Sequence, residues 1–144
     1  MTLEKHAESD YESVEAVVGG LVRAWNKGDA RSFAEYFAED ADLVNIHGMH
    51  IRGRQAIAGV YDMLFRSVFA ASTTKASISS VRLLRKTVAL VHLKVELKFH
   101  VAPTNYTVTS LVMLRDGFHW KVTALHNTRV AGAGDVRVPG RGGV

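Results

Sequence analysis

The sequence predicts an α+β fold in which helices cover one side of a single curved sheet. Three observations lead to this expectation. Apolar residues recur at helical spacing in the first half of the chain, they alternate with a period of two in the second half, and short links separate the alternating runs. A strongly bent sheet under helices encloses a cone, and an apolar cone closed at one end is a natural small-molecule pocket.

The first half of the chain predicts three helices and a hairpin. Residues 9–12 form a capping-box pattern, so we expect the first helix, of about 17 residues, to begin there. Gly28 can end this helix, and Asp29 can cap the second one. Two short alternating runs on either side of Gly48 predict a hairpin. Residues 54–70 then carry the clearest helical stripe.

Two adjacent glycines, Gly19 and Gly20, interrupt the first helix. Each costs about 1 kcal/mol relative to alanine in a helix interior. The close approach of another chain segment, or of a ligand, would explain their presence, and packing is the simpler of the two explanations.

The second half predicts four long strands, and the boundaries of the domain follow from them. The expected strands are residues 75–84, 88–99, 106–115 and 118–128. Their short links predict an antiparallel meander. We therefore expect an N-terminal arm over residues 1–9, one domain over residues 10–130, and a flexible or arm-like glycine-rich tail over residues 131–144.

Composition excludes several classes of protein. A chain of 144 residues with 47% apolar content fits one folded domain. It has no cysteine, which excludes disulfides, thiol nucleophiles and cysteine-ligated metals and suits a reducing compartment. The charged opening segment and the absence of a long apolar run predict neither a signal peptide nor a membrane span, so we expect a cytoplasmic protein.

Charge and motifs argue against nucleic acids, nucleotides and metals as partners. Half of the net charge of +4 comes from the residues after Thr128, and no basic cluster is interleaved with aromatic residues. No glycine-rich phosphate loop or serine nucleophile motif is present, so we expect no cofactor. His47 and His50 point apart across the expected hairpin turn and have no flanking third ligand, so no metal site is predicted.

Four segments carry a family resemblance. They are residues 21–45, 48–57, 88–97 and 117–128. In this order of elements the chain resembles the SnoaL-like members of the nuclear transport factor 2-like superfamily, over about residues 10–130. Within it, the chain is most similar to the SgcJ/EcaC group, whose members occur with antibiotic gene clusters, including those for enediyne polyketides. The resemblance implies the cone-shaped, cystatin-like fold and a homodimer formed through the sheet.

The resemblance does not carry over the steroid-isomerase mechanism of that superfamily. This chemistry needs a carboxylate base, and a tyrosine and a protonated aspartic acid that stabilise the enolate. The corresponding positions here hold Asn45, Leu21 and, at or next to the third position, Leu111. All three roles are vacant, so we do not expect this activity.

Four polar residues are candidates for the pocket. The resemblance places Asn45 on the concave side, and the period of two sends His47 there with it, unless His47 lies in solvent at the rim. His92 faces either the pocket or an interface. His126 and Asn127 point opposite ways, and the superfamily register favours Asn127 as the pocket residue. We predict His47 and His92 as candidate catalytic residues and Asn45 and Asn127 as ligand-binding residues.

Apolar candidates complete the expected lining. Trp25, Tyr61, Phe65 and Phe69 lie on helix faces turned toward the sheet, and Met113 lies on a central strand. In a cone the core and the pocket share one lining, so each of these residues serves one or both. Trp25 and Tyr61 also carry polar tips that can reach a ligand oxygen.

Two functions remain open from the sequence. The first is a cofactor-free enzyme that cyclises, dehydrates or isomerises an apolar, polyketide-like intermediate, with a histidine as general acid or base and Asn45 as hydrogen-bond donor. The second is a non-catalytic module that binds or delivers such an intermediate, in company with a biosynthetic enzyme.

Overall fold

The structure, a computed structural model, describes residues 3–132, with side chains from residue 9 onward. Three helices and six strands follow one another along the chain. They are α1 (Leu3–Lys27), α2 (Ala30–Glu35), β1 (Phe37–Val44), β2 (His50–Arg52), α3 (Arg54–Phe65), β3 (Thr73–Arg85), β4 (Val88–Lys98), β5 (Asn105–Asp116) and β6 (His119–Arg129).

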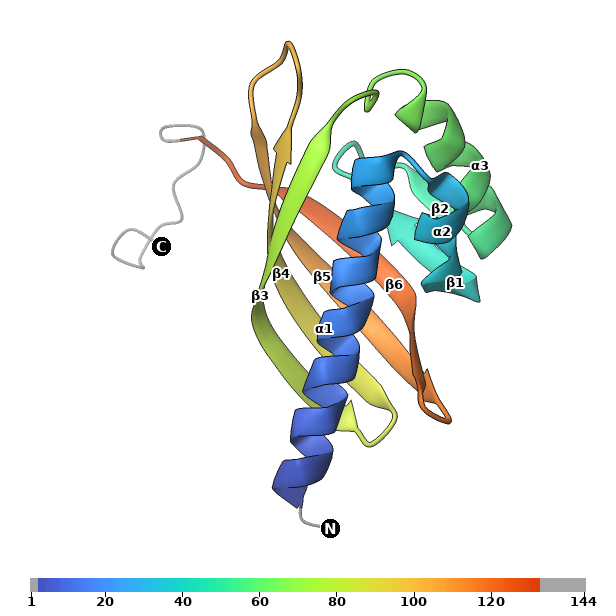
Figure 1. The fold of residues 1–144 in the computed structure, drawn as a ribbon, viewed down its shortest axis with the longest axis vertical. Helices are drawn as coiled ribbons and strands as arrows, with labels where there is room; N and C mark the ends of the chain where they lie inside the picture. The colour runs from blue at the N-terminus through green and yellow to red at the C-terminus, as the bar shows by residue number, and fades with distance from the viewer. Residues whose placement is uncertain (1–2, 133–144) are drawn as a thin grey trace.

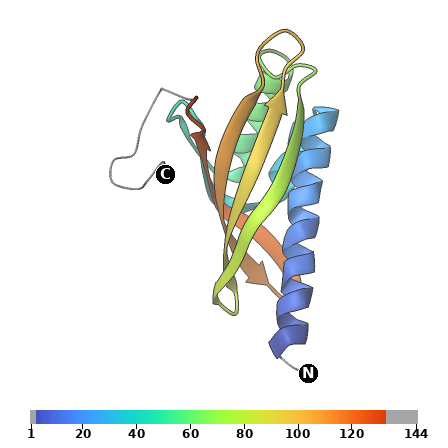
Figure 2. The same cartoon turned by 90° about the vertical axis from the view of Figure 1, so that its left-hand side faces the viewer.

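The six strands form one mixed sheet in the order β2-β1-β6-β5-β4-β3. Every neighbouring pair is antiparallel except β1 and β6, which are parallel. Figure 1 shows α1 running along the sheet, with α2 and α3 gathered beside β1 and β2. Figure 2 shows the sheet curving, with α1 beside β3. The predicted α+β class, with a curved mixed sheet and three helices, is confirmed.

The expected starts and ends of the helices differ from those observed. α1 begins at Leu3, so the capping-box expectation at residues 9–12 is wrong and residues 3–9 belong to the helix. Strong helix formers precede Ser9 and allow the helix to extend. α3 ends at Phe65 instead of residue 70 because the chain then turns toward β3, reaching a positive φ of 59° at Ala71. Of the expected tail over residues 131–144, residues 133–144 lie outside the described residues.

The local signals between these helices agree with the structure. Gly28 has a φ of 66° where α1 ends, and the Asp29 side chain caps α2 by accepting from the backbone N–H of Ser32 at 3.0 Å. This bond, together with one from the Ser32 hydroxyl, lowers the pKa of Asp29. The hairpin about Gly48 and the four-stranded meander are also present.

A bulge in β6 decides which of its residues face the core. Met113 pairs with Val122 and Val112 pairs with Ala124, so the register shifts between the two pairs. An extra residue in one strand reverses its alternation. Trp120 and Val122 are therefore buried on the same face as Leu125 and Asn127, which strict alternation would place on opposite faces.

None of the helices in residues 3–132 combines the length and the hydropathy that crossing a membrane requires.

Candidate ligand-binding cavity

A cavity of about 530 Å³ lies between the helices and the concave face of the sheet. Helices α1 and α3 contribute mostly apolar and aromatic side chains, and strands β3 to β6 supply the opposite wall. This volume is in the range of ordinary small-molecule sites. The predicted cone therefore contains a space that can hold a ligand.

The wall changes from apolar to polar along three strands. The deeper residues are buried and hydrophobic, whereas those toward the open end are polar and more exposed. In this order the residues are Leu43, Asn45 and His47 from β1 and the following turn, Leu111, Thr109 and Thr107 from β5, and Leu125, Asn127 and Arg129 from β6. Apart from the core residue Leu111, all of them line the cavity. The cavity has an apolar floor, and its mouth is polar on the side formed by β1, β5 and β6.

One end of the Asn45 side chain stabilises the turn after β1. Its Oδ1 accepts hydrogen bonds from the backbone N–H groups of His47 at 3.0 Å and Met49 at 2.9 Å. Asn favours such turns because its side chain mimics a backbone carbonyl. The two donors determine the orientation of the amide, so the second group, Nδ2, is left as a donor at the cavity wall.

A directed chain of hydrogen bonds holds Asn127. Thr109 Oγ1 donates to Asn127 Oδ1 at 2.6 Å, and the hydroxyls of Thr107 and Thr109 are 3.3 Å apart. Thr109 has only one hydroxyl hydrogen, so Thr107 is the donor in the second contact. One lone pair of the Asn127 oxygen is thereby engaged, and its Nδ2 remains a donor.

Tyr61 brings a phenol to the cavity. Within residues 9–132, every fully buried side-chain nitrogen or oxygen has a hydrogen-bond partner. The Tyr61 hydroxyl has none there, so its oxygen is not fully buried and opens onto the cavity that Tyr61 lines. Burial raises the pKa of Tyr61 to about 12. The group is therefore a neutral phenol at physiological pH and can donate or accept one hydrogen bond.

Trp25 lies at the centre of an aromatic cluster on the helical wall. Its ring centroid is 4.9 Å from that of Phe69 and 5.1 Å from that of Phe65. The indole N–H donates to Ser72 Oγ at 3.0 Å, which in turn donates to a backbone carbonyl. The expected use of the Trp25 tip on a ligand is therefore replaced by this internal bond, although its ring does line the cavity.

The structure separates the two candidate catalytic histidines. His47 lines the mouth of the cavity and is exposed to solvent. His92 lies on the outer face of the sheet, where its Nδ1 is 3.3 Å from Ser80 Oγ. The apolar residues at odd positions of β4 occupy the inner face, so an even position points away from the cavity. The structure thus places His47, and not His92, at the cavity.

The remaining candidates divide between wall and core. Tyr61, Phe69 and Asn127 line the cavity, as expected. Phe65 and Met113 were expected to contact the ligand, but the structure places both in the hydrophobic core and not in the cavity wall.

The wall residues missing from the sequence expectation include the polar residues Thr107, Thr109 and Arg129. The first two share the inner face of β5 with Leu111 and Met113. On the inner face of β5, the residues are polar at the start of the strand and apolar further along. This change indicates that the cavity opens at the start of the strand. Arg129 lies on the same face as Asn127 by simple alternation, so the favoured placement of Asn127 was a signal that could have found it.

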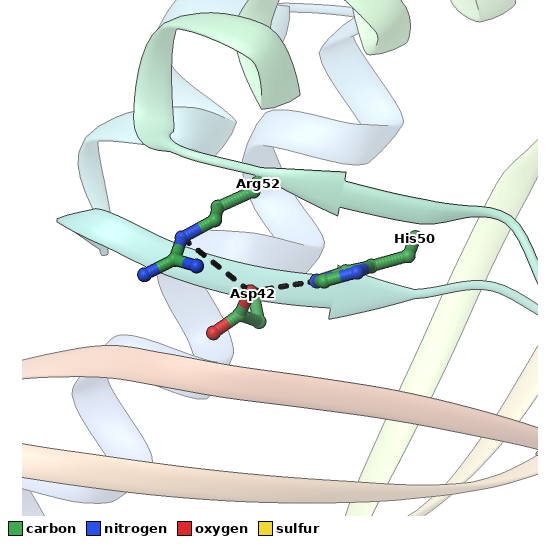
Figure 3. A network of polar contacts seen from close by, with 3 residues as sticks. All are labelled: Asp42, His50 and Arg52. Carbon is green, nitrogen blue, oxygen red and sulfur yellow. Dashed lines mark hydrogen bonds and ion pairs between the residues drawn. The ribbon is translucent and has the colours of Figure 1, made fainter.

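An ion-pair network lies on the outer face of β1 and β2, as Figure 3 shows. His50 Nε2 is 2.6 Å from Asp42 Oδ1, and Arg52 Nε is 4.0 Å from the same oxygen. Asp42 pairs with Ala124 and Arg52 in the sheet, whereas the neighbouring Leu43 faces the cavity. The network is thus separate from the cavity. No group of three metal-ligating side chains occurs within the described residues.

Comparison with known proteins identifies the fold family. The profile of the family described as SnoaL-like domain matches residues 18–125, most of the chain. The chain belongs to the SnoaL-like domain family. The matched SnoaL-like region begins in the middle of α1 and ends in β6 at Leu125, which lies in the apolar floor of the cavity. No curated protein sequence is significantly similar to this SnoaL-like protein.

Solved structures with the same fold are distant in sequence. A domain with a cystatin-like fold from Nostoc punctiforme is 24% identical, with a TM-score of 0.80, over 92% of this chain and 81% of that chain. A cystatin-like protein from Caulobacter vibrioides is 24% identical, with a TM-score of 0.79, over 85% and 91%. A ketosteroid isomerase-like protein from Erwinia carotovora atroseptica is 15% identical, with a TM-score of 0.72, over 84% and 96%. These likenesses support the SnoaL-like fold.

Proposed function

We propose that the protein binds an apolar small molecule reversibly in the cavity. The observation that carries this proposal is the cavity of about 530 Å³, with its aromatic and aliphatic floor and a polar mouth. A few polar groups at one end of an apolar site are the usual arrangement for orienting a ligand. The family resemblance supports a polyketide-like biosynthetic intermediate as the natural ligand.

The chemistry of the wall favours binding over catalysis. The cavity-lining residues in the described part of the chain include no aspartate or glutamate. Asn45 lies where the superfamily's steroid isomerases have their base, and an amide does not take up a proton at neutral pH. Leu21 also lines the cavity and supplies no donor for an enolate.

Catalysis on the same intermediate is the second candidate, and His47 is the observation that favours it. It is the one histidine of residues 9–132 that lines the cavity, and an imidazole can carry a proton near neutral pH. Cyclisation, dehydration and isomerisation all need such a carrier. Mass spectrometry of a bound ligand before and after incubation distinguishes conversion from binding.

A cavity-filling variant tests the proposal. Ala76 lines the cavity, whereas the next residue of β3, Ser77, faces the other side of the sheet. We expect Ala76→Trp to weaken binding of the neutral dye Nile red about tenfold or more, as followed by its fluorescence, because the indole occupies the ligand's space. Ser77→Trp is the matched control and should bind as the wild type does.

Two results would refute the binding proposal. One is the absence of Nile red binding to folded wild-type protein. The other is equal affinity of the wild type and Ala76→Trp, which would place the dye elsewhere. Native mass spectrometry of freshly purified protein adds an independent reading, since a retained apolar molecule would identify the class of ligand.

A further inference from the structure

We infer that the ligand of the cavity carries a carboxylate or another anionic oxygen group, which Asn45, Asn127 and Arg129 hold at the mouth. This inference rests on the proposed binding function and names the chemical class of its ligand: an apolar body with an acidic oxygen head group.

The first argument is the direction of the two amides. The Asn45 oxygen accepts two backbone N–H groups of its own turn, and the Asn127 oxygen accepts the Thr109 hydroxyl. Both lone pairs of the Asn45 oxygen and one of the two on the Asn127 oxygen are thus engaged within the protein, and each amide offers its N–H groups to the cavity. A ligand here meets mainly donors, which favours an acceptor group on the ligand.

The second argument is that these two donors are neighbours. In the parallel pairing of β1 with β6, Leu43 pairs with Leu125 and Val44 with His126. Asn45 and Asn127 are the next residues on the two segments, and both line the cavity above that leucine pair. Two amides side by side can donate to the two oxygens of one carboxylate.

The third argument is charge. Arg129 follows Asn127 on the same face of β6, lines the mouth, and its guanidinium has no ion pair or hydrogen bond within the described residues. None of the lining residues in that part of the chain is acidic. A cation and several donors without a nearby carboxylate favour an anion, and they disfavour a cationic ligand.

Three pyrene probes with the same apolar body test this inference: 1-pyrenebutyric acid, 1-pyrenebutanol and a pyrenebutyl trimethylammonium salt. Binding is followed by pyrene fluorescence at low ionic strength. We expect the acid to bind at least tenfold more tightly than the alcohol, and the ammonium salt to bind more weakly than either. Added salt should reduce the advantage of the acid.

Two variants locate the effect. Arg129→Gln should weaken binding of the acid about fivefold or more and leave the alcohol unchanged. Asn45→Asp can keep both turn hydrogen bonds and places a negative charge at the donor site, so it should abolish the preference for the acid. Arg82→Gln removes the same charge from an exposed position outside the cavity and is the matched control.

The outcomes separate this inference from the proposed function. Equal binding of acid and alcohol, tighter binding of the ammonium salt, or an unchanged preference in Arg129→Gln would overturn the anionic head group and leave the apolar site standing. Failure of all three probes and of Nile red to bind would overturn both.

Discussion

The two ends of the Asn45 side chain have different surroundings. Its oxygen holds the turn that joins β1 to β2, and its nitrogen is left at the cavity wall. The same residue therefore contributes to the hairpin and to the polar mouth. Asn127 repeats this arrangement with a threonine hydroxyl in place of the turn. A polar residue can thus be required by the fold and still face a ligand.

At Tyr61 the raised pKa predicts a loss of stability in alkali. The folded phenol titrates at about 12 and is only 4% exposed, against about 10 for an exposed tyrosine. Above pH 10 the unfolded chain loses the Tyr61 proton, whereas the folded protein keeps it until about pH 12. The stabilisation from the neutral phenol is therefore complete below pH 10 and declines as the pH rises toward 12. A difference of two units between the folded and the unfolded pKa corresponds to about 2–3 kcal/mol in the free energy of unfolding.

Urea denaturation at pH 9 and pH 11.5 measures this effect. We expect the wild type to lose more stability between the two values than Tyr61→Phe does, because phenylalanine has no proton to release. Exposed groups titrate equally in both proteins, so the difference between them isolates Tyr61. An identical loss in the two proteins would show that the phenol is not buried as described.

At the scale of elements, α1 contacts Tyr36 through Gly20. A Cβ added at Gly20 would lie 2.1 Å from the Tyr36 hydroxyl oxygen, closer than atoms can approach. Packing, the simpler explanation of the two glycines, therefore accounts for this position. At Gly19 the nearest atom is the end of the Arg23 side chain at 3.3 Å, which is free to move.

The two glycines should respond in opposite directions to alanine. We expect Gly20→Ala to lower the free energy of unfolding by about 1–3 kcal/mol, because the Tyr36 ring must move. Gly19→Ala should be neutral or stabilise by up to about 1 kcal/mol through helix propensity. Thermal and urea unfolding measure both. Equal effects of the two substitutions would rule out the contact with Tyr36 as the cause.

At the scale of the whole molecule, the outer face of the sheet carries apolar residues that favour association with a second copy of the chain. Leu90, Val112 and Ala124 form one apolar row across β4, β5 and β6, and Val108 and Leu114 on the same face of β5 are 40% and 42% exposed. Monomers seldom leave a large apolar patch in water. We propose that a second copy covers this face in a two-fold dimer, with Lys94 and Glu96 at its rim.

Sedimentation equilibrium tests the dimer. We expect twice the chain mass of 15.8 kDa at micromolar concentration, and a single chain mass for Val112→Glu with its circular dichroism spectrum retained. Val101→Glu adds the same charge at a loop position that is 93% exposed, so it should leave the dimer intact. A wild-type protein of single chain mass would contradict the proposal.

The sequence by itself determined the class of fold, the succession of elements and the meander, because apolar periodicity and short links depend only on neighbouring residues. Turn chemistry at Gly28, Asp29 and Gly48 was equally local and agreed with the structure. The structure places Asn45 and His47 at one wall, as expected, but His47 lies in the turn after β1, so the turn that Asn45 holds positions it and strand alternation does not.

Only the tertiary structure decided which face each strand turns to the cavity and how deep each residue lies. The even positions of β4 carry both apolar and polar residues, so alternation could not decide whether His92 faced outward. The β6 bulge reversed the alternation between Val122 and Leu125, so Trp120 and Val122 share the inner face with Leu125 and Asn127. Phe65 and Met113 are buried in the core and do not reach the cavity wall. These features depend on contacts between distant segments, which a local pattern does not contain.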